Sequence, residues 1–391
     1  MKRLLLPALL LTTLTACTAA PADTLPAAVP TPTPASTPAP TAAPAPADAL
    51  TPEEKIGQLF IIRPDALDLT LPQETINDAK ADGVTMLTDA MRETLQAYPV
   101  GGICQFGKNI TDPEQLAQFN ADLQAASRTP LFIAVDEEGG AVARLANHPA
   151  FDLPQYESAA AVGASGDPAD ACAMGQTIGA YLKEYGFNMD FAPDADVNTN
   201  PDNPIIGTRA FSSDAATAAE MAAAAADGLR TSGILPTLKH FPSHGDTAED
   251  SHTALAVTYK TLDELQACEL LPFAADTGLH AVMVGHIAAP NVTGDGTPAT
   301  LSPQLVALIP DAENTLIVTD SLAMDAITAA YTPGEAAVQA LQAGCDVLLM
   351  PNSLPEAYAA VLEAVQNGTI SEERLDRSVN KILLYKQQFV S

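Results

Sequence analysis

The chain has 391 residues, of which 18 are Lys or Arg and 48 are Asp or Glu, and its formal net charge is −30. A surface this acidic argues against nucleic acid as a partner and against binding to anionic lipid through a polybasic segment, because both need clustered cations. The composition is compatible with a secreted enzyme that acts on a neutral or mildly charged substrate.

The first 16 residues have the order of parts of a secretory signal peptide. Met1-Lys2-Arg3 precede an apolar run from Leu4 to Leu11, which is too short to span a bilayer and remain there. Leu14-Thr15-Ala16 before Cys17 resembles a bacterial lipobox, which implies that Cys17 is lipidated and becomes the mature N-terminus. We therefore expect an extracytoplasmic protein held to the cell membrane by a lipid. The alternative is an ordinary signal peptide followed by a chance cysteine.

Residues 17–49 consist of the lipidated cysteine and a stretch made almost entirely of Ala, Pro, Thr and Ser. Such a stretch has little to bury and favours extended polyproline conformations. We interpret it as a tether, and residues 50–391 as a single catalytic domain.

Short apolar runs alternate with helix-like stretches throughout that domain. The eight runs are Gln58–Ile62, Gly101–Phe106, Leu131–Asp136, Phe187–Pro193, Leu235–Phe241, Ala281–His286, Leu316–Asp320 and Asp346–Met350. The clearest amphipathic stretches between them are Pro113–Ala126, Ala215–Arg230, Leu262–Phe273 and Pro333–Ala343. This alternation predicts an α/β fold with a parallel sheet, and eight repeats in one domain predict a closed (β/α)8 barrel of the TIM type. A doubly wound open sheet is the alternative.

The polar residues at the ends of the runs favour the barrel. Charged or imidazole side chains follow runs three to seven, and in a barrel these ends meet on one face, where catalytic sites are built. In an open sheet they would spread along an edge. The stretch Arg63–Tyr98 is longer than a simple connection, so we expect it to carry a helix and to cover one side of the pocket.

The four cysteines beyond Cys17 have no spacing typical of a metal site. Cys104, Cys172, Cys268 and Cys345 form no CxxC pair, so we predict no zinc and interpret them as small buried residues. A disulfide between two of them stays open.

The segment 238–252 holds the richest chemistry in the chain, because three of the six histidines fall in it, directly after the fifth run. Asp250 and His252 are two residues apart, so on an extended stretch their side chains face the same way. A carboxylate beside an imidazole fixes its tautomer and raises its basicity, which suits a group that donates and accepts protons near neutral pH.

The sequence Lys239-His240-Phe241-Pro242-Ser243-His244-Gly245, followed four residues later by Asp250-Ser251-His252, resembles the signature of the β-N-acetylglucosaminidase branch of glycoside hydrolase family 3. Further segments match the family in its order. They are Val135-Asp136-Glu137-Glu138-Gly139-Gly140, Asn188 to Pro193 with Asp196-Val197-Asn198, Asn203 to Arg209, and Val318-Thr319-Asp320.

The resemblance implies a retaining exo-β-N-acetylglucosaminidase that needs no cofactor and no metal. Asp320 matches the catalytic nucleophile, His252 the acid/base, and Asp250 its partner. The residues that match sugar-binding positions are Asp136, Arg144, Arg209, Lys239 and His240. Asp320 alone, without the resemblance, reads equally as a helix cap or a charge at the barrel mouth. The substrate expected is a carbohydrate with terminal N-acetylglucosamine, from cell-wall muropeptides or from chitin-type oligosaccharides.

Ser243 departs from the pattern, because the family has glycine there. If the position requires a positive φ, serine is held there at a cost on the order of 1 kcal/mol. Within the family the rival functions are a β-glucosidase and a β-glycoside phosphorylase, and outside it an inactive cell-wall binding lipoprotein. The Asp250-Ser251-His252 signature argues against the first, and its presence together with Asp320 argues against the last.

Overall fold

The computed structural model describes residues 47–251, 253–275 and 278–390. The predicted signal peptide, Cys17 and most of the predicted tether lie outside the described residues. His252, the predicted acid/base, also lies outside them.

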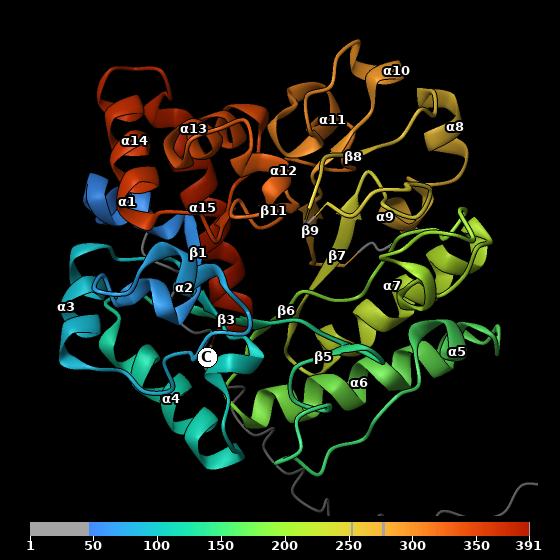
Figure 1. Ribbon diagram of the computed structural model, residues 1–391, viewed down its shortest axis with the longest axis horizontal. Helices are drawn as coiled ribbons and strands as arrows, with labels where there is room; N and C mark the ends of the chain where they lie inside the picture. The colour runs from blue at the N-terminus through green and yellow to red at the C-terminus, as the bar shows by residue number, and fades with distance from the viewer. Residues whose placement is uncertain (1–46, 252, 276–277, 391) are drawn as a thin grey trace, which may run out of the picture. The chain divides into compact units, whose positions relative to one another are not determined.

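Eight parallel strands form the predicted barrel (Figure 1). They are β1 Phe60–Ile62, β2 Gly102–Cys104, β3 Phe132–Val135, β6 Met189–Asp190, β7 Leu235–Phe241, β9 Ala281–Val284, β11 Leu316–Thr319 and β12 Leu348–Leu349. Neighbours in the sheet are neighbours in the chain, and β12 pairs with β1. A parallel bridge between Val318 and Val347 links β11 to β12 and closes the ring. The open-sheet alternative is therefore excluded.

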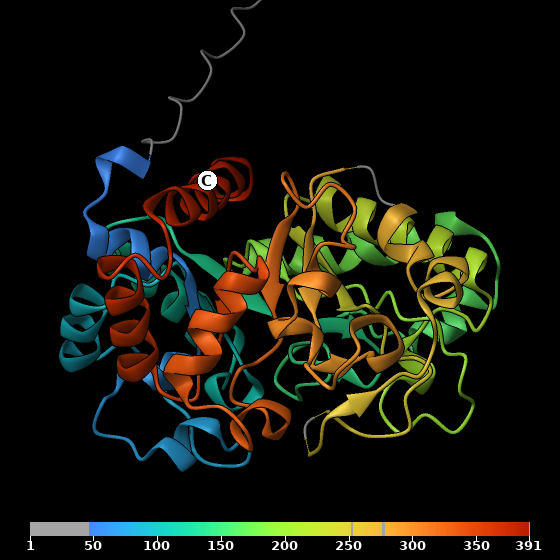
Figure 2. The same cartoon turned by 90° about the horizontal axis from the view of Figure 1, so that it is seen from above.

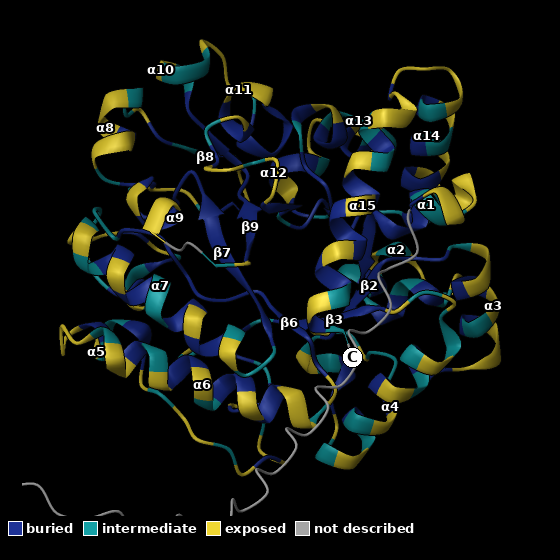
Figure 3. Ribbon diagram, turned by 180° about the vertical axis from the view of Figure 1, so that it is seen from behind, coloured by how far each residue is buried: buried dark blue, intermediate teal, exposed yellow. Residues whose placement is uncertain are grey.

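Helices surround the strands, with their inner faces buried and their outer faces exposed (Figure 3). The longer ones are α1 Pro52–Gln58, α3 Asp89–Ala97, α4 Pro113–Ala126, α6 Pro168–Glu184, α7 Ala215–Thr231, α13 Pro333–Ala343, α14 Leu354–Gln366 and α15 Glu372–Phe389. The shorter ones are α2 Gln73–Asn77, α5 Ala159–Gly163, α8 Leu262–Ala267, α9 Leu271–Ala275, α10 Pro290–Thr293, α11 Pro303–Val306 and α12 Asp325–Thr328. No described helix is both long and apolar enough to cross a bilayer.

Side-chain caps set where the long helices begin. Asp112, Asp167 and Asp214 each accept a hydrogen bond from a backbone N–H in the first turn of α4, α6 and α7. Proline follows the first two of these caps, at a position where a missing N–H costs nothing. The Asp-Pro pairs in the sequence therefore mark helix starts.

The single helix predicted over Leu262–Phe273 is wrong, because the stretch forms two short helices, α8 and α9. Pro272 explains the break. It has no N–H to donate to the carbonyl of Cys268, and its ring would clash with that carbonyl in a continuous helix. Glu269, in the break, is fully buried and pairs with the ammonium group of Lys260.

The long connection between β1 and β2 contains helices, as expected. It carries a 3₁₀ turn at Pro64–Leu67 together with α2 and α3. Lys108, just after β2, donates from Nζ to the carbonyl oxygens of Thr75, Ile76 and Asp78, each at 3.0 Å. These bonds hold α2 against the carboxyl end of the barrel.

The last residues assigned to the tether belong to the folded domain. A 3₁₀ turn at Ala47–Ala49 packs beside α15 (Figure 2), and the backbone N–H of Ala47 donates to Asn380 Oδ1 at 3.1 Å. Among the cysteines, Cys104 and Cys345 are buried as expected, whereas Cys172 and Cys268 are half-buried. All four are free thiols, so no disulfide joins them.

The inner face of α15 buries a lysine. Lys386 is 3% exposed, donates from Nζ to Gln58 Oε1 at 2.6 Å and lies 5.3 Å from the centre of the Phe132 ring. Burial lowers the pKa of this lysine to about 7. The unfolded chain, with a lysine pKa of about 10.4, then binds more protons than the folded chain between these two values, so this group makes stability rise with pH across that window.

We expect Lys386→Met to stabilise the fold at pH 6 by on the order of 3 kcal/mol, because the folded protein no longer buries a charge. The gain should shrink as the pH approaches 10. Urea unfolding of the domain at several pH values measures it, with the exposed Lys80→Met as the control, expected to change stability by less than about 0.5 kcal/mol. A gain that is independent of pH would contradict the account.

Candidate active site

A pocket of about 200 Å³ opens at the carboxyl ends of the strands. Its wall includes six of the predicted site residues, which are Asp136, Arg144, Arg209, Lys239, His240 and Asp320. A larger hollow of about 620 Å³, beside α4 and the end of α6, contains none of them. The barrel therefore brings together residues that are up to 184 positions apart, from Asp136 to Asp320.

The ammonium group of Lys239 lies at the centre of this wall. It is 2.8 Å from Asp136 Oδ1 and 2.7 Å from Glu138 Oε1, and the side chain is 2% exposed. Burial alone would lower the pKa of Lys239, but the two carboxylates more than offset burial and raise it. Burial likewise favours the neutral form of Asp136, and Lys239 with Arg144 outweighs it, so the pKa of Asp136 lies below its usual value. The carboxyl group of Asp136 is therefore fully ionised at neutral pH.

Glu138 also holds a second cation. Arg209 donates from Nε to Glu138 Oε2 at 2.8 Å and from Nη2 to Glu138 Oε1 at 2.7 Å, a bidentate pair. Despite burial, Arg209 and Lys239 hold the pKa of Glu138 far below its usual value. Arg144 completes the set, with Nη2 3.7 Å from Asp136 Oδ2. Three cations, one on β7 and the others on the segments after β5 and β6, thus face two carboxylates.

A short hairpin, β4 Glu137–Gly139 and β5 Val142–Ala143, positions Arg144. Gly139 and Gly140 turn the chain with φ values of +83° and +62°, which side chains disfavour. The carboxylate of Glu137 points away from the pocket and accepts the backbone N–H groups of Arg144, Leu145 and Ala146 at 2.6 to 2.9 Å. The hairpin is therefore fixed by a buried carboxylate that takes no part in the pocket.

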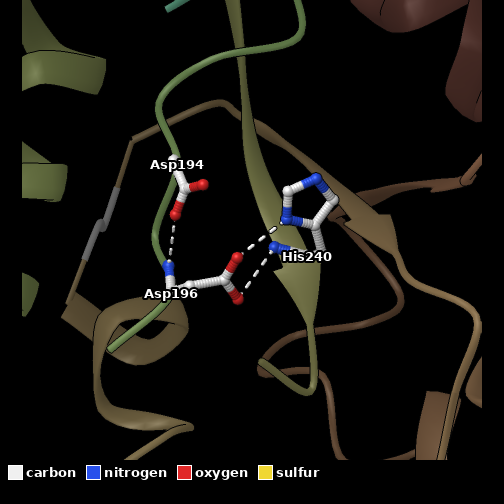
Figure 4. Close-up of side chains that lie close together, drawn as sticks. All are labelled: Asp194, Asp196 and His240. Carbon is white, nitrogen blue, oxygen red and sulfur yellow. Dashed lines mark hydrogen bonds and ion pairs between the residues drawn. The ribbon is translucent and has the colours of Figure 1, made fainter. Parts of the chain in front are cut away.

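His240 is oriented by a carboxylate on the loop after β6 (Figure 4). Its Nδ1 lies 2.8 Å from Asp196 Oδ2, and its backbone N–H donates to Asp196 Oδ1 at 3.3 Å. Although burial opposes it, this contact lowers the pKa of Asp196 to about 2. The imidazole Nε2 then faces the pocket, 3.4 Å from Arg209 Nη2.

Asp194, Asp196 and His240 could in principle hold a divalent metal, since each offers a donor atom within 4.8 Å of the others. Each residue of the cluster already has a neighbour of the opposite kind, while the buried Asp194 Oδ2 accepts no hydrogen bond from the described residues. Asp196 pairs with His240 Nδ1, and Arg209 Nε lies 3.5 Å from Asp194 Oδ2. A guanidinium group at that distance competes with a metal cation for the same oxygen, so the cluster fits an ion-pair role better than a metal site.

Asp320 follows β11 directly and lines the pocket opposite the cations. Its backbone N–H donates to the carbonyl of Val284 at 2.9 Å, and its Oδ1 accepts the N–H of Ser321 at 2.7 Å. The fully buried His286 lies with Nε2 2.8 Å from the Ser321 carbonyl oxygen. This bonding fixes the backbone on both sides of the carboxylate.

The predicted acid/base segment is only partly described. Asp250 is half-buried and does not line the pocket, whereas its neighbour Ser251 is buried and does. Ser243, at the family's glycine position, has φ = +113°, so the suspected positive φ is confirmed. Its hydroxyl oxygen lies 3.4 Å from the backbone nitrogens of Val197 and Gly245, and these contacts offset part of the strain.

The residues that line the pocket but were not among the predicted site residues include Glu138, Arg63, His244 and Ser251. Glu138 lies two positions after Asp136, so the two side chains share one face of the extended chain. Arg63 directly follows the first strand, and the predicted site residues were likewise indicated by their places at strand ends. His244 and Ser251 contact each other across seven positions of one loop, which sequence spacing does not reveal.

Closed (β/α)8 barrels carry their active sites at the carboxyl ends of the strands, and a carboxylate in a pocket there suits a barrel enzyme of the glycoside hydrolase type. The model of the glycosyl hydrolase family 3 N terminal domain matches residues 51–384. The chain therefore belongs to glycosyl hydrolase family 3, as its motifs predicted.

Beta-hexosaminidases and a family 3 β-N-acetylglucosaminidase are among the proteins that the chain resembles. Beta-hexosaminidase A of Pseudoalteromonas piscicida is 32% identical over 335 residues, which cover 78% of this chain and 56% of that protein. Beta-hexosaminidase LpqI of Mycobacterium tuberculosis is 32% identical over 366 residues, covering 86% of this chain and 83% of that protein. A family 3 β-N-acetylglucosaminidase structure from Paenibacillus sp. superposes with a TM-score of 0.76 at 37% identity, over 87% of this chain and 62% of that one.

Proposed function

We propose that this chain is a retaining exo-β-N-acetylglucosaminidase that releases terminal β-linked N-acetylglucosamine from muropeptides or chitin-type oligosaccharides. The observation that carries the proposal is the convergence of five predicted sugar-binding residues and Asp320 in one pocket of about 200 Å³. The names of the relatives agree with it. A pocket of that size suits one terminal sugar, and so suits removal of residues from a chain end.

The charged wall is suited to sugar hydroxyls. Asp136 has oxygens that accept hydrogen bonds, while Lys239, Arg209 and Arg144 have N–H groups that donate them. Because each charge already has a partner of opposite sign, a neutral sugar can exchange hydrogen bonds with the wall and leave no charge unpaired. This explains how a pocket with a charged wall can suit an uncharged ligand.

The proposed reaction has two displacements at the anomeric carbon. In the first, an oxygen of Asp320 forms a bond to that carbon as the glycosidic bond breaks, and His252 gives its proton to the departing oxygen. In the second, His252 takes a proton from water, the water oxygen attacks the same carbon, and the bond to Asp320 breaks. The product keeps the β configuration. Asp250 orients the imidazole, and no cofactor or acetamido nucleophile is needed.

We expect His252→Ala to affect the two steps unequally. Nitrophenolate leaves without a proton, so the glycosyl-Asp320 intermediate should form and then hydrolyse slowly, which gives a burst of nitrophenol. Azide should restore turnover, because it attacks without a base. For a sugar leaving group, kcat/KM should fall on the order of 10²- to 10⁴-fold. Stopped-flow and steady-state assays measure both effects.

Asp320→Asn is the matched control, and it should show neither the burst nor the azide rescue because no covalent intermediate can form. An equal, small loss for His252→Ala on both substrates would mean that the proton comes from another group, with His244 the next candidate.

We also propose that the protein is extracytoplasmic and anchored to the cell membrane through a lipid on Cys17. The proposal rests on the order of charged, apolar and small residues before that cysteine. Cys17→Ala should then be secreted or retained as unprocessed precursor, and should leave the detergent phase in Triton X-114 partitioning. Recovery of an acylated Cys17→Ala protein in the detergent phase would exclude this anchor.

A further inference from the structure

The loop after β7 is tied down firmly in its first half. Asn203 Nδ2 donates to the carbonyl oxygens of His244 and Thr247 at 2.8 and 3.0 Å, and Asn200 Nδ2 donates to that of Thr247 at 3.0 Å. The hydroxyl of Thr258 donates to Asp246 Oδ2 at 2.8 Å. The segment up to Thr247 is therefore fixed to the neighbouring loop after β6.

The next part of the loop has few buried side chains. Ala248, Glu249, Thr253 and Ala254 are exposed and Asp250 is half-buried. Ser251 is different, because it is 3% exposed and lines the pocket together with Asp320. Among the described residues 248–254, it alone is buried in the body of the domain.

Ser251 contacts a histidine that is itself held in place. Its Oγ lies 3.0 Å from His244 Nε2, and Thr247 Oγ1 lies 2.6 Å from His244 Nδ1. The backbone N–H of His244 donates to Asp196 Oδ1 at 2.7 Å, and its side chain is buried. His244 thus belongs to the fixed half of the loop, while Ser251 belongs to the exposed half.

The donors and acceptors of Thr247, His244 and Ser251 define which atom donates in the contact between Ser251 and His244. The Thr247 hydroxyl also lies 2.9 Å from the carbonyl oxygen of His244 and donates to it, so Nδ1 carries the imidazole proton and Nε2 accepts from Ser251. Burial and the nearby His240 lower the pKa of His244, which keeps Nε2 available as an acceptor. The Thr247 hydroxyl thus accepts from Nδ1 and the Ser251 hydroxyl donates to Nε2, so both ring nitrogens of His244 are hydrogen-bonded.

We propose that Ser251 is a positioning residue, whose hydrogen bond to His244 anchors the exposed part of the loop at the pocket wall and so limits where its two chain neighbours, Asp250 and His252, can lie. The inference rests on the proposed function, in which these neighbours handle the proton. Adjacent Cα atoms are about 3.8 Å apart, so fixing Ser251 restricts both neighbours strongly. A proton donor gives its full rate only when it is held in the reacting geometry.

The test compares kcat/KM, which reports the first displacement, for two substrates. Ser251→Ala should lower kcat/KM for N,N′-diacetylchitobiose about three- to tenfold, as expected for one lost hydrogen bond. For dinitrophenyl N-acetylglucosaminide, which needs no proton donor, the value should stay within about twofold. Ser251→Thr keeps the hydroxyl and should recover most of the loss. Glu249→Gln, which changes an exposed side chain of the same loop, is the matched control and should change neither value.

A double-mutant cycle then tests the contact itself. His244→Phe should show the same dependence on the leaving group, and Ser251→Ala should cost nothing further in the His244→Phe background, because the bond is already lost. Thermal unfolding of each variant shows whether it is folded. If Ser251→Ala does not fold, His244→Phe alone still reports the leaving-group dependence.

Equal losses on the two substrates, no loss on either, or independent effects in the cycle would overturn the role of Ser251. These results are separate from a failure of the proposed function. If His252→Ala shows no leaving-group dependence, the acid/base assignment fails. If His252→Ala behaves as expected and Ser251→Ala does not, only the positioning role is wrong.

Discussion

The ammonium group of Lys239, buried between Asp136 and Glu138, is the interaction on which the pocket depends. A charge at 2% exposure is expensive to bury unless partners surround it, and here two carboxylates stand within 2.8 Å. Lys239 is on β7, and both carboxylates follow β3. The pairing therefore joins two parts of the barrel wall, and Glu138 extends it to Arg209 through a bidentate contact. Removal of any one member would take a partner of opposite charge from another buried member.

The site consists of a rigid part, which contains this network, and a less rigid part. The residues proposed to bind sugar are on strand ends and on a hairpin that Glu137 fixes through three backbone hydrogen bonds. Asp320 is similarly fixed by backbone bonds on β11 and β9. The proposed acid/base pair, in contrast, belongs to segment 248–254, whose described residues are mostly exposed and which Ser251 joins to His244. A sugar would thus meet a preformed wall, and only the proton donor would need a dedicated contact to hold it.

The fold could be predicted largely from the sequence, because eight apolar runs with helices between them admit few architectures and polar run ends favour closure. A local backbone conformation could also be predicted, because Ser243 has the positive φ that glycine in the family pattern indicated. The single helix predicted over Leu262–Phe273 is wrong because its apolar spacing does not reveal the break that Pro272 imposes. Glu138 was missed since its importance comes from Arg209, 71 positions away, and such pairings depend on how the barrel closes. The seven-residue contact between His244 and Ser251 depends likewise on a loop path that no periodicity encodes.

The central claim is that Asp320 forms a covalent bond to the sugar. Incubation with a 5-fluoro N-acetylglucosaminyl fluoride, whose ring fluorine slows both displacements while its fluoride leaving group speeds the first, tests this directly by intact-protein mass spectrometry followed by peptide mapping. The account predicts one adduct of a single fluorinated sugar, on the peptide that contains Asp320, and none on Asp320→Asn. Turnover without any adduct, or an adduct on another carboxylate, would contradict it.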